Sequence, residues 1–204
     1  MIGIPPCERL VLFVGRIEPL KGIDTLIQAI AILRSRGFYV CLSVIGGEPG
    51  TGQQGSEMAR LQEMCQQAGL NDLVAFLGKK AQETLPYYYS AAEVVVVPSH
   101  YESFGMVALE AMACGTPVVA SQVGGLAYLI QDGINGYSVP VDDPQLLADR
   151  LMDLLSDQNL RETLGRNAAQ SAQEYAWPKI AERVVKLYTE VLAGESTRET
   201  PSSL

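Results

Sequence analysis

Residues 94–121 read VVVVPSHYESFGMVALEAMACGTPVVAS, and this stretch decides the fold. The four consecutive valines of Val94–Pro98 form a run without polar positions, as expected of a parallel strand that is buried on both faces. The segment Met106–Cys114 is small and apolar and predicts a buried helix, and Val118–Ser121 predicts the next strand. A strand, a helix and a second strand in one short stretch indicate a parallel β–α–β unit.

The same alternation continues on both sides of this unit. Short apolar runs predict strands, and amphipathic segments predict helices between them. The expected fold is therefore α/β, a doubly wound Rossmann-like parallel sheet of about six strands with helices on both faces. The remaining expected strands are Arg9–Gly15, Val40–Gly46, Val74–Leu77 and Gly136–Val139. The remaining expected helices are Gly22–Arg36, Glu57–Ala68, Glu83–Ala91, Pro144–Ser156, Asn159–Tyr175 and Trp177–Ala193.

No segment rich in glycine, proline or serine divides the chain, so one domain is expected over residues 1–194. Residues 195–204 are polar without an apolar pattern and are expected to be disordered. A formal net charge of −8 argues against a nucleic-acid partner, which needs a basic face. No signal peptide is visible at the N-terminus, and the expected location is cytoplasmic.

The cysteines and the histidine limit the chemistry. Cys7, Cys41, Cys65 and Cys114 are widely spaced and are expected to be reduced. His100 is the single histidine, so a histidine-rich metal site is excluded and a Ser-His-Asp triad is disfavoured. We expect neither a metal nor a cofactor.

The loop after the first strand carries two cations. Arg16 and Lys21 lie between Gly15 and Gly22 at the carboxyl end of that strand, which is where doubly wound sheets bind ligands. A guanidinium fork and a lysine point charge suit a phosphate or a diphosphate. The alternative is a solvated loop in which the arginine caps a neighbouring carbonyl.

Glu102 and Glu110 form the second candidate pair. Glu110 lies in an otherwise apolar segment, where an unpaired carboxylate is costly, so it needs a partner. We expect Glu102 to precede the helix, Glu110 to project from its third turn, and the free amides of residues 103–107 to face a phosphate. One carboxylate would then hold a ribose and the other a hexose. The alternative makes Glu102 an accessory of the helix cap and places Glu110 in a buried salt bridge.

Four other features are assigned ordinary roles. The glycine-rich stretch Gly46–Gly55 lacks the ending of a phosphate loop and is interpreted as a surface insertion. His100 is interpreted as a polar loop residue. Tyr87–Tyr89 are expected to pack a helix face with their phenols toward water, and Trp177 is expected to be a packing anchor.

These motifs, in this order, resemble those of a known family. The chain is similar to the group 1, family four retaining glycosyltransferases in GRIEPLKG (15–22), FLG (76–78), the stretch from Pro98 to Ala120, and DGING (132–136). The resemblance covers residues ~9 to ~190 and is to the C-terminal nucleotide-sugar-binding domain of that family. Its most specific element is the pair of glutamates separated by seven residues.

The resemblance implies a role for each matching residue. Arg16 and Lys21 would hold the donor diphosphate and stabilise the departing nucleotide, while Glu102 would contact the transferred hexose. Glu110 would bind the ribose hydroxyls. The base would lie near the loop that begins with Gly78 and Lys79. Hexose and phosphate contacts would come from Ser103, Phe104, Gly105, Met106 and Val107.

The resemblance also implies an activity, the retaining transfer of a hexose from a nucleoside-diphosphate sugar, UDP-linked, without metal or cofactor. Family members have two Rossmann-like domains, the GT-B arrangement, with the acceptor domain first. The N-terminal acceptor domain is therefore expected to be absent from this chain, and the lone domain to be inactive. Any peripheral membrane contact would run through that missing half. The alternative is a non-catalytic nucleotide-sugar-binding module that acts with a partner chain. Many family members carry Pro-Glu after the two glycines, where this chain has Leu-Ala-Tyr at the end of Gly124–Tyr128. The resemblance therefore implies no hexose or acceptor contact at these positions.

Overall fold

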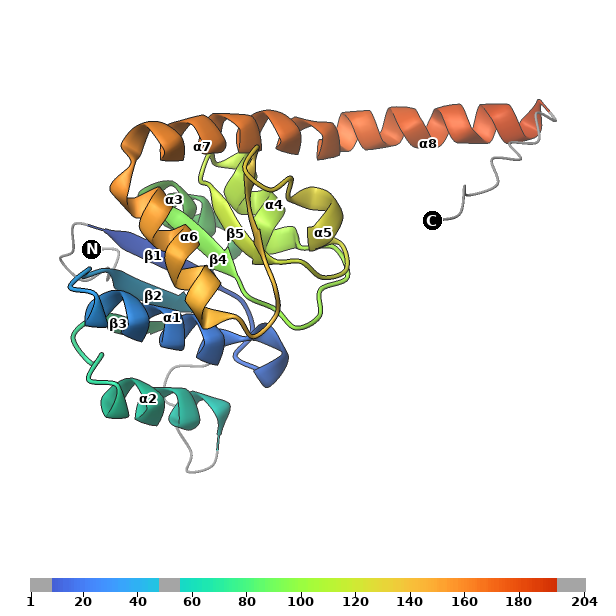
Figure 1. Cartoon of the computed structure of the whole chain (residues 1–204). Helices are drawn as coiled ribbons and strands as arrows, with labels where there is room; N and C mark the ends of the chain where they lie inside the picture. The colour runs from blue at the N-terminus through green and yellow to red at the C-terminus, as the bar shows by residue number, and fades with distance from the viewer. Residues whose placement is uncertain (1–8, 48–55, 194–204) are drawn as a thin grey trace.

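The computed structural model describes residues 9–47 and 56–193. Its six strands form one parallel sheet in the order β3-β2-β1-β4-β5-β6 (Figure 1). The chain order reverses between β1 and β4, so the loops after these two strands flank the usual ligand position of a doubly wound sheet. The strands are β1 (Leu10–Val14), β2 (Cys41–Ile45), β3 (Val74–Gly78), β4 (Val94–Val97), β5 (Val118–Ser121) and β6 (Gly136–Val139).

Helices cover both faces of the sheet, which confirms the predicted fold class (Figure 1). One face is covered by α1 (Ile23–Ser35), α2 (Glu57–Gln67) and α6 (Pro144–Ser156). The other face is covered by α3 (Leu85–Ala91), α4 (Met106–Ala113) and α5 (Leu126–Leu129), with α7 (Gln158–Ala172) packed along α4. Three short 3₁₀ turns are η1 (Pro19–Lys21), η2 (Gln82–Thr84) and η3 (Gln173–Tyr175).

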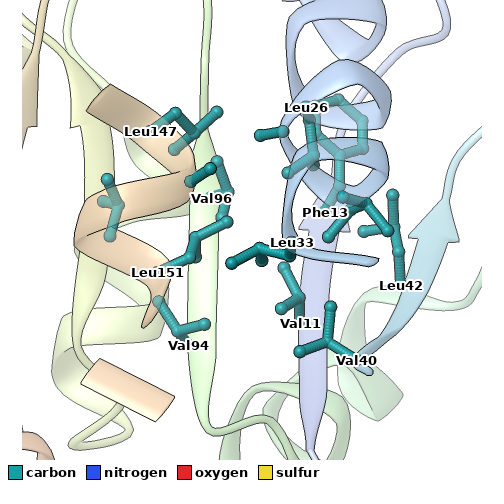
Figure 2. Close-up of a cluster of buried hydrophobic side chains, with 14 of the residues drawn as sticks. Val11, Phe13, Leu26, Leu33, Val40, Leu42, Val94, Val96, Leu147 and Leu151 are labelled. Carbon is teal, nitrogen blue, oxygen red and sulfur yellow. The ribbon is translucent and has the colours of Figure 1, made fainter. Parts of the chain in front are cut away.

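Neighbouring strand residues point into two separate hydrophobic clusters, which explains the uninterrupted apolar runs. In β1, Val11 faces the cluster beneath α1 and α6, and the next residue, Leu12, faces the cluster beneath α3 and α4. Figure 2 shows the first cluster, where Leu33 of α1 and Leu151 of α6 close over the sheet. Fully burying a side chain of this size stabilises a fold by about 1.5–3 kcal/mol. The two clusters hold the strands, and therefore the loops at their carboxyl ends, in fixed positions.

Several local expectations need correction. The segment expected as a helix over 159–175 is α7 followed by η3, and the sequence pattern did not predict α5. Trp177 is 82% exposed, so its assignment as a packing anchor is wrong. It begins α8 (Trp177–Leu192), which has no buried residue and extends beyond the sheet as a continuation of α7 (Figure 1). Residues 195–204 and most of the Gly46–Gly55 stretch lie outside the described residues.

The described cysteines differ in state. Cys65 and Cys114 are free thiols, as expected, whereas Cys41 is disulfide-bonded, so the expectation of a reduced thiol is wrong for Cys41. Burial raises the pKa of the Cys65 thiol to about 11, which makes it a poor nucleophile near neutral pH. None of the helices within the described ranges is both long enough and apolar enough to cross a membrane.

Candidate functional site

Lys21 and Glu102 meet at the point where the strand order reverses. Lys21 ends η1 in the loop between β1 and α1, and Glu102 lies 81 residues further on, in the loop between β4 and α4. Nζ of Lys21 donates to Oε2 of Glu102 at 2.7 Å, and both side chains are only 19% exposed. Water screens such a pair less than it screens an ion pair on the open surface. Lys21 and Glu102, which the sequence indicated as separate candidates, therefore form one ion pair that is largely shielded from water.

Close backbone approaches hold the two loops together. The amide of His100 donates to the carbonyl of Leu20 at 2.9 Å. Gly22 has a φ of +63°, and a Cβ at this position would lie 2.0 Å from the carbonyl oxygen of Pro98. Glycine is required there both for the left-handed backbone and for the approach of the neighbouring loop. The glycine at residue 22 thus brings Lys21 within reach of Glu102.

A second pair of glycines supports the Glu102 loop from the other side. The amide of Gly125 donates to the carbonyl of Glu102 at 3.1 Å. A Cβ on Gly124 would lie 1.9 Å from the same carbonyl oxygen. The Gly124–Tyr128 stretch, which the sequence left without a role, therefore has a packing role at its glycines: it fixes the backbone that carries Glu102.

The N-terminus of α4 opens next to the Lys21–Glu102 pair. Gly105 is its N-cap, with a φ of +99° and no side-chain cap, so the first amides of the helix, at Met106 and Val107, have no intrahelical acceptor. Ser103 and Phe104 are exposed, and the Phe104 ring packs edge-on against Tyr175. This cluster of free amides has the geometry and the positive dipole end of an anion site.

Glu110 lies one turn further into α4. Because the helix begins at Met106, Glu110 is in its second turn rather than the expected third. The hydroxyl of Tyr89 donates to Oε2 of Glu110 at 2.7 Å, and Nε2 of Gln82 donates to Oε1 at 3.0 Å. Among the described residues its partners are thus a phenol and an amide, so the alternative of a buried salt bridge is wrong. The carboxylate is held in place without being neutralised.

Tyr89 differs from the expectation that its phenol faces water. Its side chain is buried, as is that of Tyr88, and only Tyr87 is exposed. Burial, reinforced by the hydrogen bond to Glu110, raises the pKa of the Tyr89 hydroxyl far above its usual value. The hydroxyl therefore remains protonated and remains a donor to the carboxylate. The sequence contained no signal for this contact, because the two side chains come from different helices.

Two adjoining cavities lie beside these residues. One of about 450 Å³ is lined by Arg16, Glu18, Lys79 and Lys80, together with apolar residues at the ends of β1 and β2. Arg16 is exposed and pairs with Glu18 at 2.7 Å, a surface contact worth little that a bound anion can replace. Another cavity of about 320 Å³ is lined by Gln82, Tyr89 and Glu110, and Leu85 lines both.

The predicted residues therefore fall into two groups. Arg16 and Lys79 line the larger cavity and Glu110 the smaller one, whereas Lys21 and Glu102 line neither and lie by the start of α4. Gly78 ends β3 directly before Lys79, and its carbonyl accepts from the amide of Gly46 at 3.2 Å. In residues 9–47 and 56–193, no three histidine, cysteine, aspartate or glutamate side chains are grouped so as to hold a metal ion.

Tyr89→Phe tests the support of Glu110. Removing the phenol oxygen leaves Oε2 of Glu110 without its donor, and a hydrogen bond to a charged group contributes about 1.5–3 kcal/mol. We expect the free energy of unfolding, measured by urea denaturation, to fall by about that amount. Tyr128→Phe, at a tyrosine that is almost fully exposed, is the matched control and should change nothing. Equal stability of the two variants would show that the hydroxyl does not hold Glu110.

A doubly wound parallel sheet with charged loops at its strand-order reversal is the arrangement of nucleotide-binding α/β proteins. The chain belongs to the glycosyl transferases group 1 family, whose model matches residues 2–171. It is 42% identical over 192 residues to the D-inositol 3-phosphate glycosyltransferase of Corynebacterium jeikeium, a match that covers 93% of this chain and 45% of that enzyme. The chain thus spans less than half the length of this relative.

Solved structures show the same fold. Sucrose-phosphate synthase from Thermosynechococcus elongatus superposes with a TM-score of 0.81 at 39% identity, over 95% of this chain and 47% of that one. HepE of Anabaena, solved in complex with UDP, superposes with a TM-score of 0.79 at 29% identity, over 89% of this chain and 48% of that one. The sheet and its surrounding helices are those of a C-terminal domain in a GT-B glycosyltransferase.

Proposed function

We propose that this chain is the donor-binding domain of a retaining glycosyltransferase, which moves a hexose from a UDP-linked sugar to an acceptor held by another domain. The observation that carries the proposal is the shielded Lys21–Glu102 pair beside the uncapped start of α4. A cation and free amides suit a diphosphate, and the adjacent carboxylate suits sugar hydroxyls. The UDP bound by the related HepE supports the choice of nucleotide.

The diphosphate would lie between the β1–α1 loop and the start of α4. Lys21 and Arg16 would contact its oxygens, and the amides of residues 103–107 would add donors at the positive end of the helix dipole. Glu102 would contact the hexose that is attached to the second phosphate. Because Lys21 already pairs with Glu102, one lysine would orient both the phosphate and the carboxylate.

The nucleoside would lie over the two cavities. Glu110, held by Tyr89 and Gln82, would accept hydrogen bonds from the ribose hydroxyls. The base would contact the segment that begins with Gly78 and Lys79, at the wall of the larger cavity.

The proposed chemistry needs no cofactor. Breaking the bond between sugar and phosphate leaves negative charge on the diphosphate, and preorganised cations with a helix N-terminus stabilise that charge. In a front-face transfer, the leaving phosphate takes the proton from the acceptor hydroxyl while that oxygen bonds to the anomeric carbon. Arg16 and Lys21 would act on the leaving group, and Glu102 would orient the hexose.

The acceptor would be bound by an N-terminal domain, because this chain spans only 45% of the curated relative it resembles. We propose that residues 1–194 form the donor domain, that the enzyme works in the cytoplasm, and that any membrane contact belongs to the other domain. By itself the chain would bind donor weakly and transfer sugar negligibly, since half of the cleft is supplied elsewhere.

Calorimetric titration with UDP, GDP and ADP tests this function. We expect UDP to bind at least tenfold more tightly than the other two, a difference of about 1.4 kcal/mol. Equal binding of all three would contradict UDP as the nucleotide, and no binding of any would contradict a donor site in this chain. Binding without transfer when an acceptor domain is supplied would instead favour a non-catalytic module.

A further inference from the structure

His100 connects three parts of the fold beside the proposed donor site. It lies in the β4–α4 loop, two residues before Glu102, but its side chain points to the loop between β6 and α6. Its Nε2 atom is 2.9 Å from Oδ1 of Asp142. The hydroxyl of Thr25, in the first turn of α1, donates to the same Oδ1 atom at 3.3 Å. The β4–α4 loop, the β6–α6 loop and α1 are therefore joined through one carboxylate.

The contact between His100 and Asp142 is close and shielded from water at the imidazole. Nε2 of His100 is buried and makes no well-aligned hydrogen bond among the described residues, although Oδ1 of Asp142 is within ion-pair distance. At 2.9 Å the imidazole edge is in direct contact with the Asp142 carboxylate, so neither loop can shift without moving the other.

Asp142 adopts a backbone conformation that costs free energy. Its φ is +56°, and it is the single non-glycine residue with a positive φ in residues 9–47 and 56–193. That conformation costs roughly 1–2 kcal/mol for most residues with a side chain and less for aspartate, which adopts it more readily. The neighbouring Asp143 caps α6 by accepting from the amide of Leu146 at 2.9 Å. The two aspartates thus have separate tasks, and the strained one faces His100.

His100 also touches the turn that carries Lys21. Its amide donates to the carbonyl of Leu20, and its Cδ2 atom lies 3.4 Å from where a Cβ of Gly22 would be. The imidazole therefore packs beneath the end of η1, while the chain leads in two residues to Glu102. A shift of this ring would change the spacing between the two members of the Lys21–Glu102 pair.

We propose that His100 is a positioning residue, which together with Asp142 sets the spacing of Lys21 and Glu102 and thereby the fit of the hexose-diphosphate part of the donor. The inference rests on the proposed function, because it assigns the pair to donor binding. His100 itself would not contact the donor. Its loss should weaken binding of UDP-glucose, whose hexose needs Glu102 in place, more than binding of UDP.

The test compares four variants of the 204-residue chain by calorimetry with UDP and with UDP-glucose. His100→Ala removes the imidazole. In His100→Gln the side-chain amide takes the place of Nε2 and keeps a polar group against Asp142, whereas in His100→Asn the amide takes the place of Nδ1 and does not reach. Asp142→Gly removes the carboxylate and tolerates the positive φ. Circular dichroism of each variant checks that the fold is retained.

We expect His100→Ala, His100→Asn and Asp142→Gly each to lower the affinity for UDP-glucose relative to UDP by about tenfold, and His100→Gln to restore it. An unchanged ratio in His100→Ala would overturn the inference while leaving the proposed function intact. An Asp142→Gly variant that behaves like the unaltered chain would also overturn it, since His100 would then act on the donor directly. If the unaltered chain binds neither ligand, the proposed function fails and this inference fails with it.

Discussion

Replacing Gly22 by alanine is expected to destabilise the chain by about 2–5 kcal/mol, the combined cost of a left-handed residue and of overpacking. The added Cβ would lie 2.0 Å from the carbonyl oxygen of Pro98, so the β1–α1 and β4–α4 loops must move apart. Lys21 precedes this residue directly and would leave Glu102. Urea denaturation should show the loss of stability, and UDP binding should fall with it.

Gly37→Ala is the matched control for this substitution. Gly37 has a φ of +76°, close to that of Gly22, but a Cβ there meets no atom within 4 Å. It therefore carries the cost of the left-handed backbone without the clash. We expect it to lose about 1–2 kcal/mol and to bind UDP normally. If the two variants lose the same stability, contact between the two loops does not matter.

Lys21→Met is expected to lower the affinity for UDP by about 10- to 100-fold. A charge-assisted hydrogen bond contributes about 1.5–3 kcal/mol, and methionine keeps the unbranched chain up to the position of Cε without the charged Nζ. Lys186→Met, on the exposed surface of α8, is the control for the loss of one positive charge and should bind UDP normally. Calorimetry measures both variants. Unchanged binding by Lys21→Met would remove this lysine from the donor site.

The sheet was predictable from the sequence because both of its faces are buried. Val94–Val97, for example, has no polar interruption, since alternate valines fill separate clusters. Helices with several turns were also predictable, because burying one face gives their apolar residues a regular helical spacing. The four residues of α5 are too few to show a period, so Leu126–Leu129 was not predicted as a helix. The place of Glu110 in α4 also differed from expectation, because the helix begins at Met106 and Glu110 is therefore in its second turn rather than its third.

The candidate site was predicted in its parts but not in its pairings. Charge type and position after strands pointed to Lys21 and Glu102, and its apolar surroundings in the sequence pointed to Glu110. Nothing in the sequence, however, brings Lys21 to Glu102 across 81 residues. The partners of Glu110 come from η2 and α3, whose orientation toward α4 depends on tertiary packing. His100 was interpreted only as a polar loop residue, because the sequence does not show its partner. That partner, Asp142, lies in the loop after β6, and both β5 and β6 separate the two residues along the chain. Contacts between loops follow from strand order, which a single sequence does not reveal.

The most direct test of a donor site at the reversal of strand order is a titration of the chain with UDP, followed by the amide shifts in ¹H–¹⁵N NMR spectra. We predict that the largest shifts fall in three segments: residues 15–22, residues 78–80 and residues 103–110. These segments follow β1, β3 and β4, and the structure brings their charged side chains to one edge of the sheet. Shifts confined to α2, α7 or α8, or no shifts at saturating UDP, would contradict the assignment of this edge as the nucleotide site.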